Sequence, residues 1–555
     1  MERGSLIKVY ERSFREHWDL PLYTDYSKRF TMTYGDVARR IAWLHLLFRE
    51  AGVRKNAKIA LIGRNTPYWT TTYMAVITYG ATIVPILQDF NPNDVHHIVN
   101  HSGATFLFCS DKHWDSLEED KMENLNAVFS LDGFYCLHQK DGQDAQRVVT
   151  GLDDAFAKAY PQGFGPADVT YDDRDDEEIF MISYTSGSTG FSKGVMLSGR
   201  AIAGNVDFGI ETRLLEAGDR VLTFLPLAHA YGMAFDFLTC TAVGAHSYLL
   251  NKVPSPKILV KAFGEVHPTV IFTVPLVLEK IYRKQLQPNL STTGMRFALN
   301  IPLLDHYIYG QVRDKLTEAL GGEFKEVIIG GAPLNREVED FLRKIGFRFT
   351  VGYGMTECAP LIAYANCGEF RPYSCGKVLP GMQARVDSAD PENEAGEILV
   401  RGRNVMSGYY NNPDATKNAF TEDGWMRTGD MGVIDKDGHL YIKGRCKSMI
   451  LGANGQNIYP EQIEDKLNNL PFVMESLVME REGKLVALVY PDYNAMDEAH
   501  VRNQDIPLIM EENRKLLNTA VAAYENVSRI AIYPTEFEKT PKKSIKRYLY
   551  ANITL

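Results

Sequence analysis

The first part of the chain alternates between short apolar segments and helix-like segments, and this alternation limits the possible folds more than any other feature. From Lys58, KIALIG is typical of a buried strand, and PYWTTTYMAVITYG, which ends at Gly80, is typical of a helix. TIVPI then fits a second strand, and TFLFCS, after a polar helix, fits a third. Because alternating strands and helices form parallel sheets that are covered by helices, the pattern predicts an α/β protein.

Further patterns of predicted secondary structure follow along the chain. VLTFLPLAH, TVIFTVPLVLEKIY and FKEVIIGGAPL repeat the strand-to-helix pattern, so we expect two doubly wound sheets. From about residue 375 to 444, short strands and tight turns predict a small antiparallel sheet or β-barrel. The last hundred or so residues mix helices and strands, which is typical of a separate α+β unit. We therefore predict a large N-terminal domain over residues 1–445 and a small C-terminal domain over residues 446–555.

Composition narrows the class of protein. The formal net charge is −10 over 555 residues, whereas a nucleic-acid-binding surface needs clustered Lys and Arg, so we expect no nucleic-acid partner. The 7 cysteines are scattered and form no C-x-x-C pair, which argues against a disulfide framework or a zinc site. The charged N-terminus and the lack of any run of about 18 apolar residues predict neither a signal peptide nor a membrane span. We expect a cytoplasmic protein, and peripheral contact with a membrane surface stays open.

The stretch from Tyr184 to Leu197 reads YTSGSTGFSKGVML, and its Gly, Ser and Thr residues suit an anion. Glycine lets backbone N–H groups approach a phosphate closely, and hydroxyl groups donate to its oxygens. The spacing does not fit a P-loop, because Lys193 follows Gly190 by three residues and is itself followed by Gly194. Taken alone, the stretch is equally consistent with a flexible surface linker.

Polar and aromatic residues also follow three other predicted strands. LPLAHAYG places His229 and Tyr231 after one strand, GGAPL begins at Gly330 after the next, and VGYGMTE carries Tyr353 and Glu357 after another. Each feature alone has an ordinary structural explanation, such as a turn or a core histidine. Ligands of parallel sheets bind at the carboxyl ends of the strands, however, so the four turns together predict one shared site.

TSGSTGFSKG, LPLAHAYG, GGAPL, GYGMTE, GWMRTGD, IKGR and KTPKKSIKR, in this order, resemble the motifs of the adenylate-forming superfamily. That superfamily includes acyl-CoA synthetases, firefly luciferases and adenylation domains. The matching motifs run from Tyr184 to Arg547. The first 180 residues match only in their alternation of strand-like and helix-like segments. The resemblance implies two doubly wound sheets plus a β-barrel, capped by a mobile C-terminal lid. It also implies two steps, in which a carboxylate attacks the α-phosphorus of ATP and a thiol then displaces AMP.

The resemblance implies roles for residues that match the motifs, and the chemistry of these side chains agrees with them. Glu357 is a hard oxygen ligand for Mg²⁺, with Thr185 as a second candidate ligand. Asp430 would accept hydrogen bonds from the ribose hydroxyls, and Arg445 would add a contact to ribose or phosphate. Tyr353 would stack on adenine, and Thr356 would bond the α-phosphate. The full predicted nucleotide site is Thr185, Ser186, Gly187, Ser188, Thr189, Gly190, Lys193, Gly331, Ala332, Pro333, Tyr353, Gly354, Met355, Thr356, Asp430 and Arg445.

The predicted acyl and thiol site lies beside the nucleotide. His229 would gate or orient the carboxylate, with Tyr231 and Gly330 near the acyl group and Gly455 at the channel for the pantetheine arm of CoA. The apolar stretch LAHAYGMAFDFL favours an acyl chain, and VPLVLEKIYRK resembles the long-chain fatty acyl branch. Asp236 is an alternative anchor for an amino group, although a helix-surface or buried, hydrogen-bonded aspartate fits it better. Lys447 occupies the hinge position of the family.

One departure from the family pattern affects the predicted catalysis. The family carries a lysine immediately before its I-K-R-like triplet, and this chain has Ser544 there, with Lys543 one residue earlier. A long lysine side chain at position 543 could substitute, and we count Lys543 as catalytic with Thr185, His229 and Glu357. We therefore predict a fatty acyl-CoA synthetase that uses ATP, Mg²⁺ and CoA. The alternatives are a ligase that loads a separate acyl-carrier protein, and a nucleotide- or acyl-binding protein with weakened catalysis.

Overall fold

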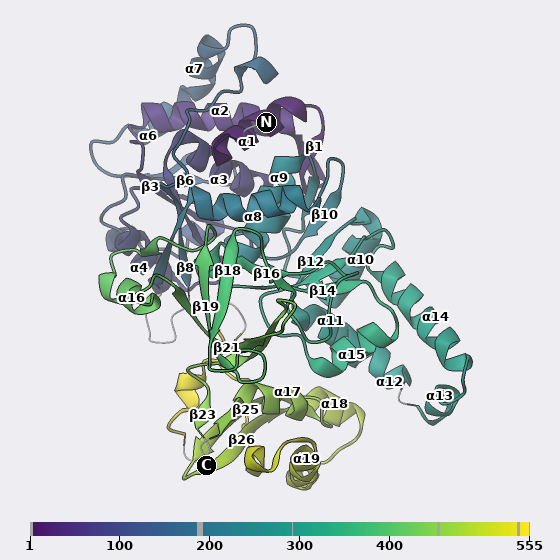
Figure 1. The fold of residues 1–555 in the computed structure, drawn as a ribbon. Helices are drawn as coiled ribbons and strands as arrows, with labels where there is room; N and C mark the ends of the chain where they lie inside the picture. Colours follow the sequence, from purple (N-terminus) through teal and green to yellow (C-terminus); the bar gives the residue numbers. More distant parts are fainter. Residues whose placement is uncertain (1–3, 186–192, 291, 452–455, 541–543, 554–555) are drawn as a thin grey trace.

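The structure is a computed structural model of residues 1–555. It describes all of them except residues 1–3, 186–192, 291, 452–455, 541–543 and 554–555. Figure 1 shows a large N-terminal body above a smaller C-terminal part, which follows the antiparallel strands that end at residue 445.

The predicted parallel sheet forms the centre of an eight-stranded sheet with the order β20-β9-β8-β4-β3-β5-β6-β7. Its strands are β3 (Lys58–Ile62), β4 (Thr82–Ile86), β5 (Phe106–Cys109), β6 (Ala127–Ser130), β7 (Cys136–Gln139), β8 (Ile179–Thr185), β9 (Lys193–Ser198) and β20 (Gly408–Tyr409). The three segments predicted as strands from the apolar texture are β3, β4 and β5, and they pair in parallel. The helix predicted between the first two is α3 (Pro67–Tyr79), which ends at Gly80 in a left-handed conformation (φ 92°).

A second set of strands, parallel except for the edge strand β2, carries the other predicted strand-to-helix units. It consists of a four-stranded sheet, β10-β11-β1-β2, and a three-stranded sheet, β12-β13-β14. Their strands are β1 (Pro21–Asp25), β2 (Phe30–Thr33), β10 (Arg220–Thr223), β11 (His246–Leu249), β12 (Ile271–Thr273), β13 (Val327–Ile329) and β14 (Phe349–Val351). The N-terminal strand β1 pairs in parallel with β11, so the N-terminus belongs to this second set.

Helices cover these sheets, and many begin with a polar cap followed by proline. In α3, α4, α10 and α16 the side chain before the proline accepts a hydrogen bond from a backbone N–H of the first turn, which favours a helix start there. The remaining helices of the body are α1 (Leu6–Glu16), α2 (Tyr34–Glu50), α4 (Pro92–Ser102), α5 (Asp111–Trp114), α6 (Ala145–Thr150), α7 (Leu152–Ala159), α8 (Gly199–Glu211), α9 (Cys240–Val243), α10 (Pro256–Val266), α11 (Pro275–Ile281), α12 (Gln287–Leu290), α13 (Thr293–Ala298), α14 (Leu304–Ala319), α15 (Arg336–Lys344) and α16 (Pro413–Ala419). No helix among the described residues combines the length and the apolar character needed to span a bilayer.

Antiparallel strands follow in the region predicted to be a small sheet or barrel. They are β15 (Tyr353–Gly354), β16 (Leu361–Tyr364) and β17 (Lys377–Val378) in one sheet, and β18 (Met382–Asp387), β19 (Gly396–Gly402), β21 (Met426–Ile434) and β22 (Leu440–Arg445) in another. The pairing of β21 with β22 sets Asp430 opposite Arg445. These two residues belong to different motifs, and the strand pairing makes them neighbours.

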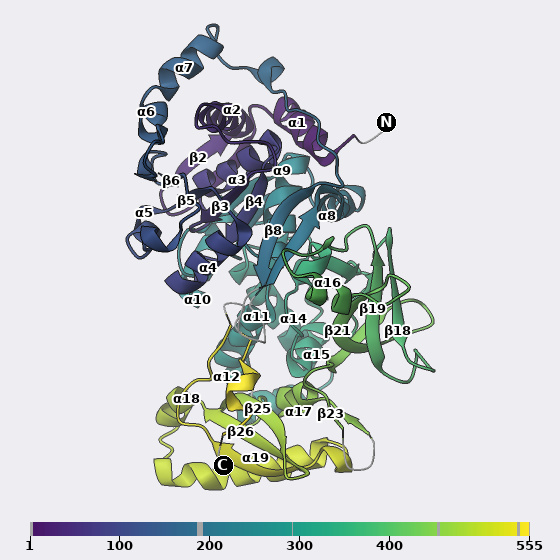
Figure 2. The ribbon, with the colours of Figure 1, turned by 90° about the vertical axis from the view of Figure 1, so that its left-hand side faces the viewer.

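The C-terminal part has its own sheet and its own buried hydrophobic residues. Its elements are β23 (Ile450–Leu451), β24 (Asn457–Ile458), α17 (Pro460–Leu467), β25 (Val473–Arg481), β26 (Lys484–Pro491), α18 (Tyr493–Glu498), α19 (Ile506–Ala520) and β27 (Val527–Ile532). Two clusters of buried side chains, between Ile458 and Val527 and between Leu477 and Tyr550, lie apart from the core of the body. Figure 2 shows this part below the body.

Candidate functional site

The turns that follow the parallel strands open into one large cleft of about 1980 Å³ between the body and the C-terminal part. The described residues of the predicted site all line it: Thr185, Lys193, His229, Tyr231, Gly330, Gly331, Ala332, Pro333, Tyr353, Gly354, Met355, Thr356, Glu357, Asp430, Arg445 and Lys447. The other predicted residues, Ser186, Gly187, Ser188, Thr189, Gly190, Gly455 and Lys543, lie outside the described residues. The structure therefore brings residues from six separate motifs to one cavity.

Three side chains form a compact polar cluster in this cleft. Tyr353 donates its hydroxyl hydrogen to Asp430 Oδ2 (2.6 Å), and Arg445 Nε lies 2.9 Å from Asp430 Oδ1. Burial raises the pKa of Asp430 above its usual range, and the charge of Arg445 opposes this shift. Both carboxylate oxygens are thus oriented by neighbours and keep lone pairs for further donors, which suits a pair of sugar hydroxyl groups.

A second chain of contacts links the ends of the glycine-rich loop to Glu357. Thr185 and Lys193 face each other in the β8–β9 pairing. Lys193 Nζ lies 4.8 Å from the centre of the Tyr409 ring, and Tyr409 donates its hydroxyl hydrogen to Glu357 Oε1 (3.0 Å). The strand β20 sets this position, because it pairs antiparallel with β9 and places Tyr409 opposite Val195. We did not predict Tyr409, and its only sequence signal is a Gly-Tyr pair before a turn.

Glu357 is the described residue whose chemistry best suits a magnesium ion. Its side chain is half-buried, and Met406 N–H donates to its backbone oxygen (2.8 Å), which fixes the turn. Among the described residues no group of three or more His, Cys, Asp or Glu side chains could hold a metal by itself. Mg²⁺ commonly binds through one or two carboxylates, with phosphate oxygens and water as the other ligands. The single carboxylate therefore fits an ion that arrives with a nucleotide.

The other end of the cleft is apolar. Tyr231 is buried and donates its hydroxyl hydrogen to the backbone oxygen of Ile328 (2.9 Å). A Cβ atom at Gly330 would lie 3.1 Å from this ring, so glycine allows the close approach, and Gly331 next to it requires φ 85°. His229 is half-buried, and its Nδ1 accepts a long hydrogen bond from Tyr231 N–H (3.4 Å). The wall beyond them is built from Phe208, Leu214, Phe235, Phe272 and Ile328.

Asp236 is not part of this wall. It lies in the π-helical segment Gly232–Thr239 and is fully buried. Neither carboxylate oxygen has a hydrogen-bond partner among the described groups, and burial raises the pKa of Asp236 well above its usual range. Asp236 is therefore no anchor for an amino group in the cleft.

The C-terminal segment also reaches the cleft. Ser544, Ile545, Lys546 and Arg547 line it, and Ser544 accepts a backbone hydrogen bond from Thr540 N–H (2.8 Å). Arg547 pairs with Glu464 of α17 and donates to the backbone oxygen of Val478 (3.3 Å). Burial raises the pKa of Glu464 to about 7, although Arg547 opposes this. This pair attaches the C-terminal segment to α17, and we did not predict it.

Side chains of the body contact the C-terminal part on the other side of α17. Asn335 caps α15 and also donates its Nδ2 hydrogens to Asp465 Oδ1 (2.6 Å) and Asn469 Oδ1 (2.9 Å). Arg283 donates to the backbone oxygen of Asn468 (2.8 Å). These polar contacts hold the C-terminal part in its observed position, and no motif signalled them.

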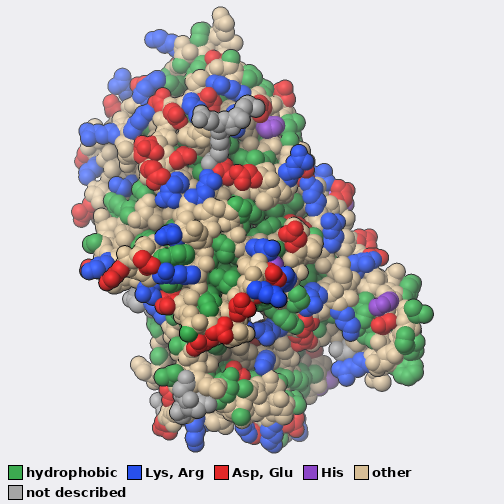
Figure 3. Space-filling view, viewed as in Figure 1, with side chains coloured by type: hydrophobic (Ala, Val, Ile, Leu, Met, Phe, Trp, Pro, Cys, Tyr) green, Lys and Arg blue, Asp and Glu red, His purple; other side chains and the backbone are tan. Residues whose placement is uncertain are grey.

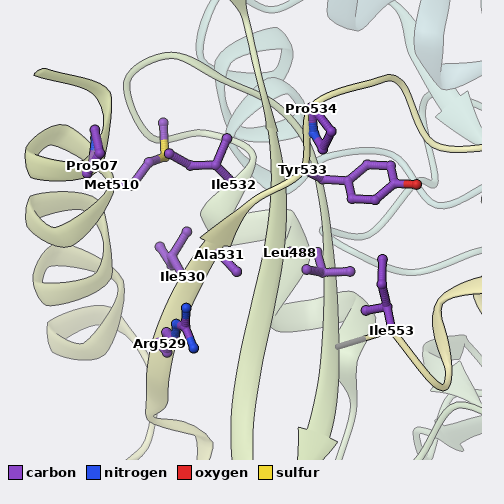
Figure 4. Close-up of a pocket in the computed structure, with 10 residues that line it drawn as sticks. All are labelled: Leu488, Pro507, Met510, Arg529, Ile530, Ala531, Ile532, Tyr533, Pro534 and Ile553. Carbon is purple, nitrogen blue, oxygen red and sulfur yellow. The ribbon is translucent and has the colours of Figure 1, made fainter. Parts of the chain in front are cut away.

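A smaller cavity of about 440 Å³ lies within the C-terminal part, away from the cleft. Figure 4 shows its mostly apolar lining between α19 and β27. None of the residues predicted from the sequence lines it, whereas the described ones line the large cleft.

Comparisons with known proteins agree with this geometry. A family model described as AMP-binding enzyme matches residues 10–410, and a model described as AMP-binding enzyme C-terminal domain matches residues 447–552. The long-chain-fatty-acid–CoA ligase FadD15 of Mycobacterium bovis is 29% identical over 601 residues, covering 99% of this chain and 96% of that protein. Long chain acyl-CoA synthetase 4 of Arabidopsis thaliana is 28% identical, covering 85% of this chain and 75% of that protein.

Solved structures share the fold at lower identity. ATP-bound MatB from Rhodopseudomonas palustris superposes with a TM-score of 0.75 at 21% identity, covering 98% of each chain. The anthranilate CoA ligase AuaEII in complex with anthranoyl-AMP superposes with a TM-score of 0.78 at 17% identity, covering 98% of this chain and 96% of that chain. With the family model matched over most of the body and the second model over the C-terminal part, this chain belongs to the family of AMP-binding enzymes.

Proposed function

We propose that this enzyme activates a medium- or long-chain fatty acid with ATP to form an acyl-adenylate, and then transfers the acyl group to CoA. One observation carries the proposal. The Tyr353–Asp430–Arg445 cluster, the Lys193–Tyr409–Glu357 chain and an apolar wall all face the same cleft. The printed names of the curated relatives, which are fatty-acid CoA ligases, support the same reaction and this substrate class.

In the first step a carboxylate oxygen of the fatty acid forms a bond to the α-phosphorus of ATP, and the bond from that phosphorus to the bridging oxygen breaks to release pyrophosphate. Asp430 and Arg445 would hold the ribose, and Thr356 the α-phosphate. Thr185 and Lys193, with the glycine-rich loop, would neutralise the departing phosphates. Because both reactants are anions, positioning and charge neutralisation would supply most of the rate enhancement.

Magnesium would be held by Glu357 together with the phosphate oxygens, with Thr185 as a further candidate ligand. When bound, the ion would neutralise phosphate charge and hold the pyrophosphate oxygens in place. Tyr409 would keep Glu357 oriented through its hydroxyl group.

The acyl chain would lie against the apolar wall beyond Tyr231 and Gly330, with His229 at the boundary between this wall and the nucleotide. In the second step the CoA sulfur would attack the acyl carbon, and AMP would leave with the electrons of the broken bond. We propose that residues 446–555 turn about Lys447 between the steps and bring the segment around Gly455 to the thiol channel. The separate buried clusters of this part and its polar contacts with the body support such a motion.

Hydroxylamine trapping with a panel of carboxylic acids and ATP tests the proposal. We expect hydroxamate and pyrophosphate with fatty acids of medium or long chain, and acyl-CoA when CoA replaces hydroxylamine. Transfer to an acyl-carrier protein but not to CoA would favour the carrier-loading alternative. ATP binding without release of pyrophosphate from any acid would contradict the enzymatic function and favour a binding protein. Replacing Lys543 with Ala in the same assay tests whether that residue substitutes for the lysine that Ser544 replaces.

A further inference from the structure

A helical projection extends from the body between η4 (Tyr282–Leu286) and the middle of α14. Figure 1 shows α12, α13 and the start of α14 reaching away from the sheets, with α13 at the far end. None of the described residues from 283 to 308 is buried, and the flanking residues Tyr282 and Tyr309 are. Much of the projection is therefore exposed, although Leu286, Leu290 and Leu299 are half-buried and pack against the core of the body.

The outer end of this projection is apolar. Phe297, Leu303 and Tyr307 are 72%, 82% and 65% exposed, and Ile301 and Leu304 are about 40% exposed. We name these five residues the apolar tip. Figure 3 shows hydrophobic side chains gathered at this end of the molecule. Scattered exposed hydrophobic residues need no explanation, but a cluster within eleven residues indicates a binding surface.

Backbone hydrogen bonds hold the tip in shape. Asp305 N–H donates to Ile301 O (3.1 Å), and Tyr307 N–H donates to Leu303 O (3.2 Å). Leu303 itself has a positive φ of 75°, an unfavourable conformation for leucine. Because the Leu303 side chain is 82% exposed, it contributes little to folding.

The charge around the tip is opposite in sign to that of the whole chain. Residues 280–307 carry four basic residues, Lys280, Arg283, Lys284 and Arg296, and one acidic residue, Asp305 within the tip, whereas the chain as a whole has a net charge of −10. Arg283 is bonded to the C-terminal part. Within the described structure the other three make no ion pair, so their charges are available to an anionic partner.

We propose that the apolar tip inserts into the surface of an anionic lipid bilayer, with Lys280, Lys284 and Arg296 contacting the headgroups. A projecting end with exposed aliphatic side chains and two aromatic rings suits shallow insertion, and nearby basic residues add attraction to anionic lipids. This inference is independent of the proposed catalytic activity, because it concerns binding alone.

Co-sedimentation of the full chain with vesicles tests it. One set of vesicles is phosphatidylcholine alone, and the other contains phosphatidylglycerol as well. The variant Phe297→Ser/Leu303→Ser/Tyr307→Ser removes the tip, and Lys280→Gln/Lys284→Gln/Arg296→Gln removes the charge. A matched control, Val253→Ser/Leu508→Ser/Leu516→Ser, removes three exposed apolar side chains elsewhere. Thermal melting checks that each variant folds.

We expect the wild type to bind anionic vesicles and to bind them less at high salt. The tip variant should bind at least about tenfold more weakly, and the control should bind as the wild type does. The charge variant should lose the preference for anionic vesicles. Wild-type protein that ignores both vesicles, or a tip variant that binds as well as the wild type, overturns the proposal. Sedimentation velocity checks the alternative: a wild-type dimer that the tip variant converts to monomer would make the tip a contact between two copies and would overturn the lipid proposal.

Discussion

Asp430 shows how a single residue can serve both the fold and the site. It is 5% exposed and bonded to both Tyr353 and Arg445, so its carboxylate is fixed before any ligand arrives. A preoriented acceptor loses little side-chain entropy on binding, which favours recognition of a sugar with two adjacent hydroxyl groups.

Replacing Asp430 with Asn should weaken nucleotide binding. The amide keeps the size of the side chain but loses the charge that pairs with Arg445 and that, as we propose, accepts from the ribose. A hydrogen bond to a charged group contributes about 2 kcal/mol, so we expect roughly 30-fold weaker AMP binding by calorimetry. Asp423→Asn, at an exposed turn, is the matched control. Equal affinities for the Asp430 variant and the wild type would exclude a ribose contact.

Glu357 should set the magnesium requirement. We expect Glu357→Gln to lower the rate of ATP–pyrophosphate exchange on the order of 100-fold and to raise the Mg²⁺ concentration needed for half the maximal rate. Tyr409→Phe removes only the hydrogen bond to Glu357, so its effect should stay below about tenfold. An unchanged Mg²⁺ dependence in the Glu357 variant would assign the ion to other ligands.

At the scale of elements, α17 connects the two sides of the cleft. Glu464 holds Arg547 on one side of this helix, and Asp465 accepts from Asn335 on the other. One helix therefore joins the C-terminal segment to the body. The sequence predicted helices and strands in this region, and the structure has α17 over Pro460–Leu467, but the partners of its charged residues could not be predicted. They come from segments about 80 and 130 residues away, and only the tertiary fold brings them together.

The Glu464–Arg547 pair should make adenylation sensitive to pH. The pKa of Glu464 is raised to about 7, so the carboxyl group gains a proton as the pH falls through neutrality and its attraction to Arg547 weakens. We expect ATP–pyrophosphate exchange to fall on the acid side with an apparent pKa near 7. Glu464→Gln should be slower at pH 8 and should lose this dependence, whereas Glu482→Gln, at an exposed turn, should keep it. An identical pH profile in the Glu464 variant would contradict the role of the pair.

At the scale of the whole molecule, the predicted order of segments matches the observed architecture: strand–helix units come first, then antiparallel strands, then a mixed α+β part. The βαβ pattern correctly predicted β3, β4 and β5, which pair in parallel. Buried parallel strands need continuous apolar runs, and each such run can be recognised from a few neighbouring residues. The place of β1 beside β11 was not predictable, since nothing within residues 21–25 specifies a partner more than two hundred residues away. The motif residues could be assigned to one site because strand ends converge, whereas Tyr409 and Asn335 act through contacts that no local pattern encodes.

The contacts between body and C-terminal part should favour the first half-reaction. In the observed arrangement Ser544 and Arg547 face the cleft, and Asn335 helps to hold that arrangement. We expect Asn335→Ala to slow ATP–pyrophosphate exchange by about tenfold, which corresponds to the loss of one or two hydrogen bonds. Transfer from preformed acyl-AMP to CoA should change less. Asn393→Ala, in an exposed turn, is the control, and equal slowing of both steps would contradict a role in the arrangement.

The Asp430–Arg445 contact lies just before Lys447 in the chain. If the lid turns about Lys447, this contact stays with the body and does not travel. The adenosine end of the mixed anhydride would remain anchored while a different protein face comes to the acyl end. The reactive intermediate would then pass between the two steps without leaving the enzyme, and little of it would be lost to hydrolysis.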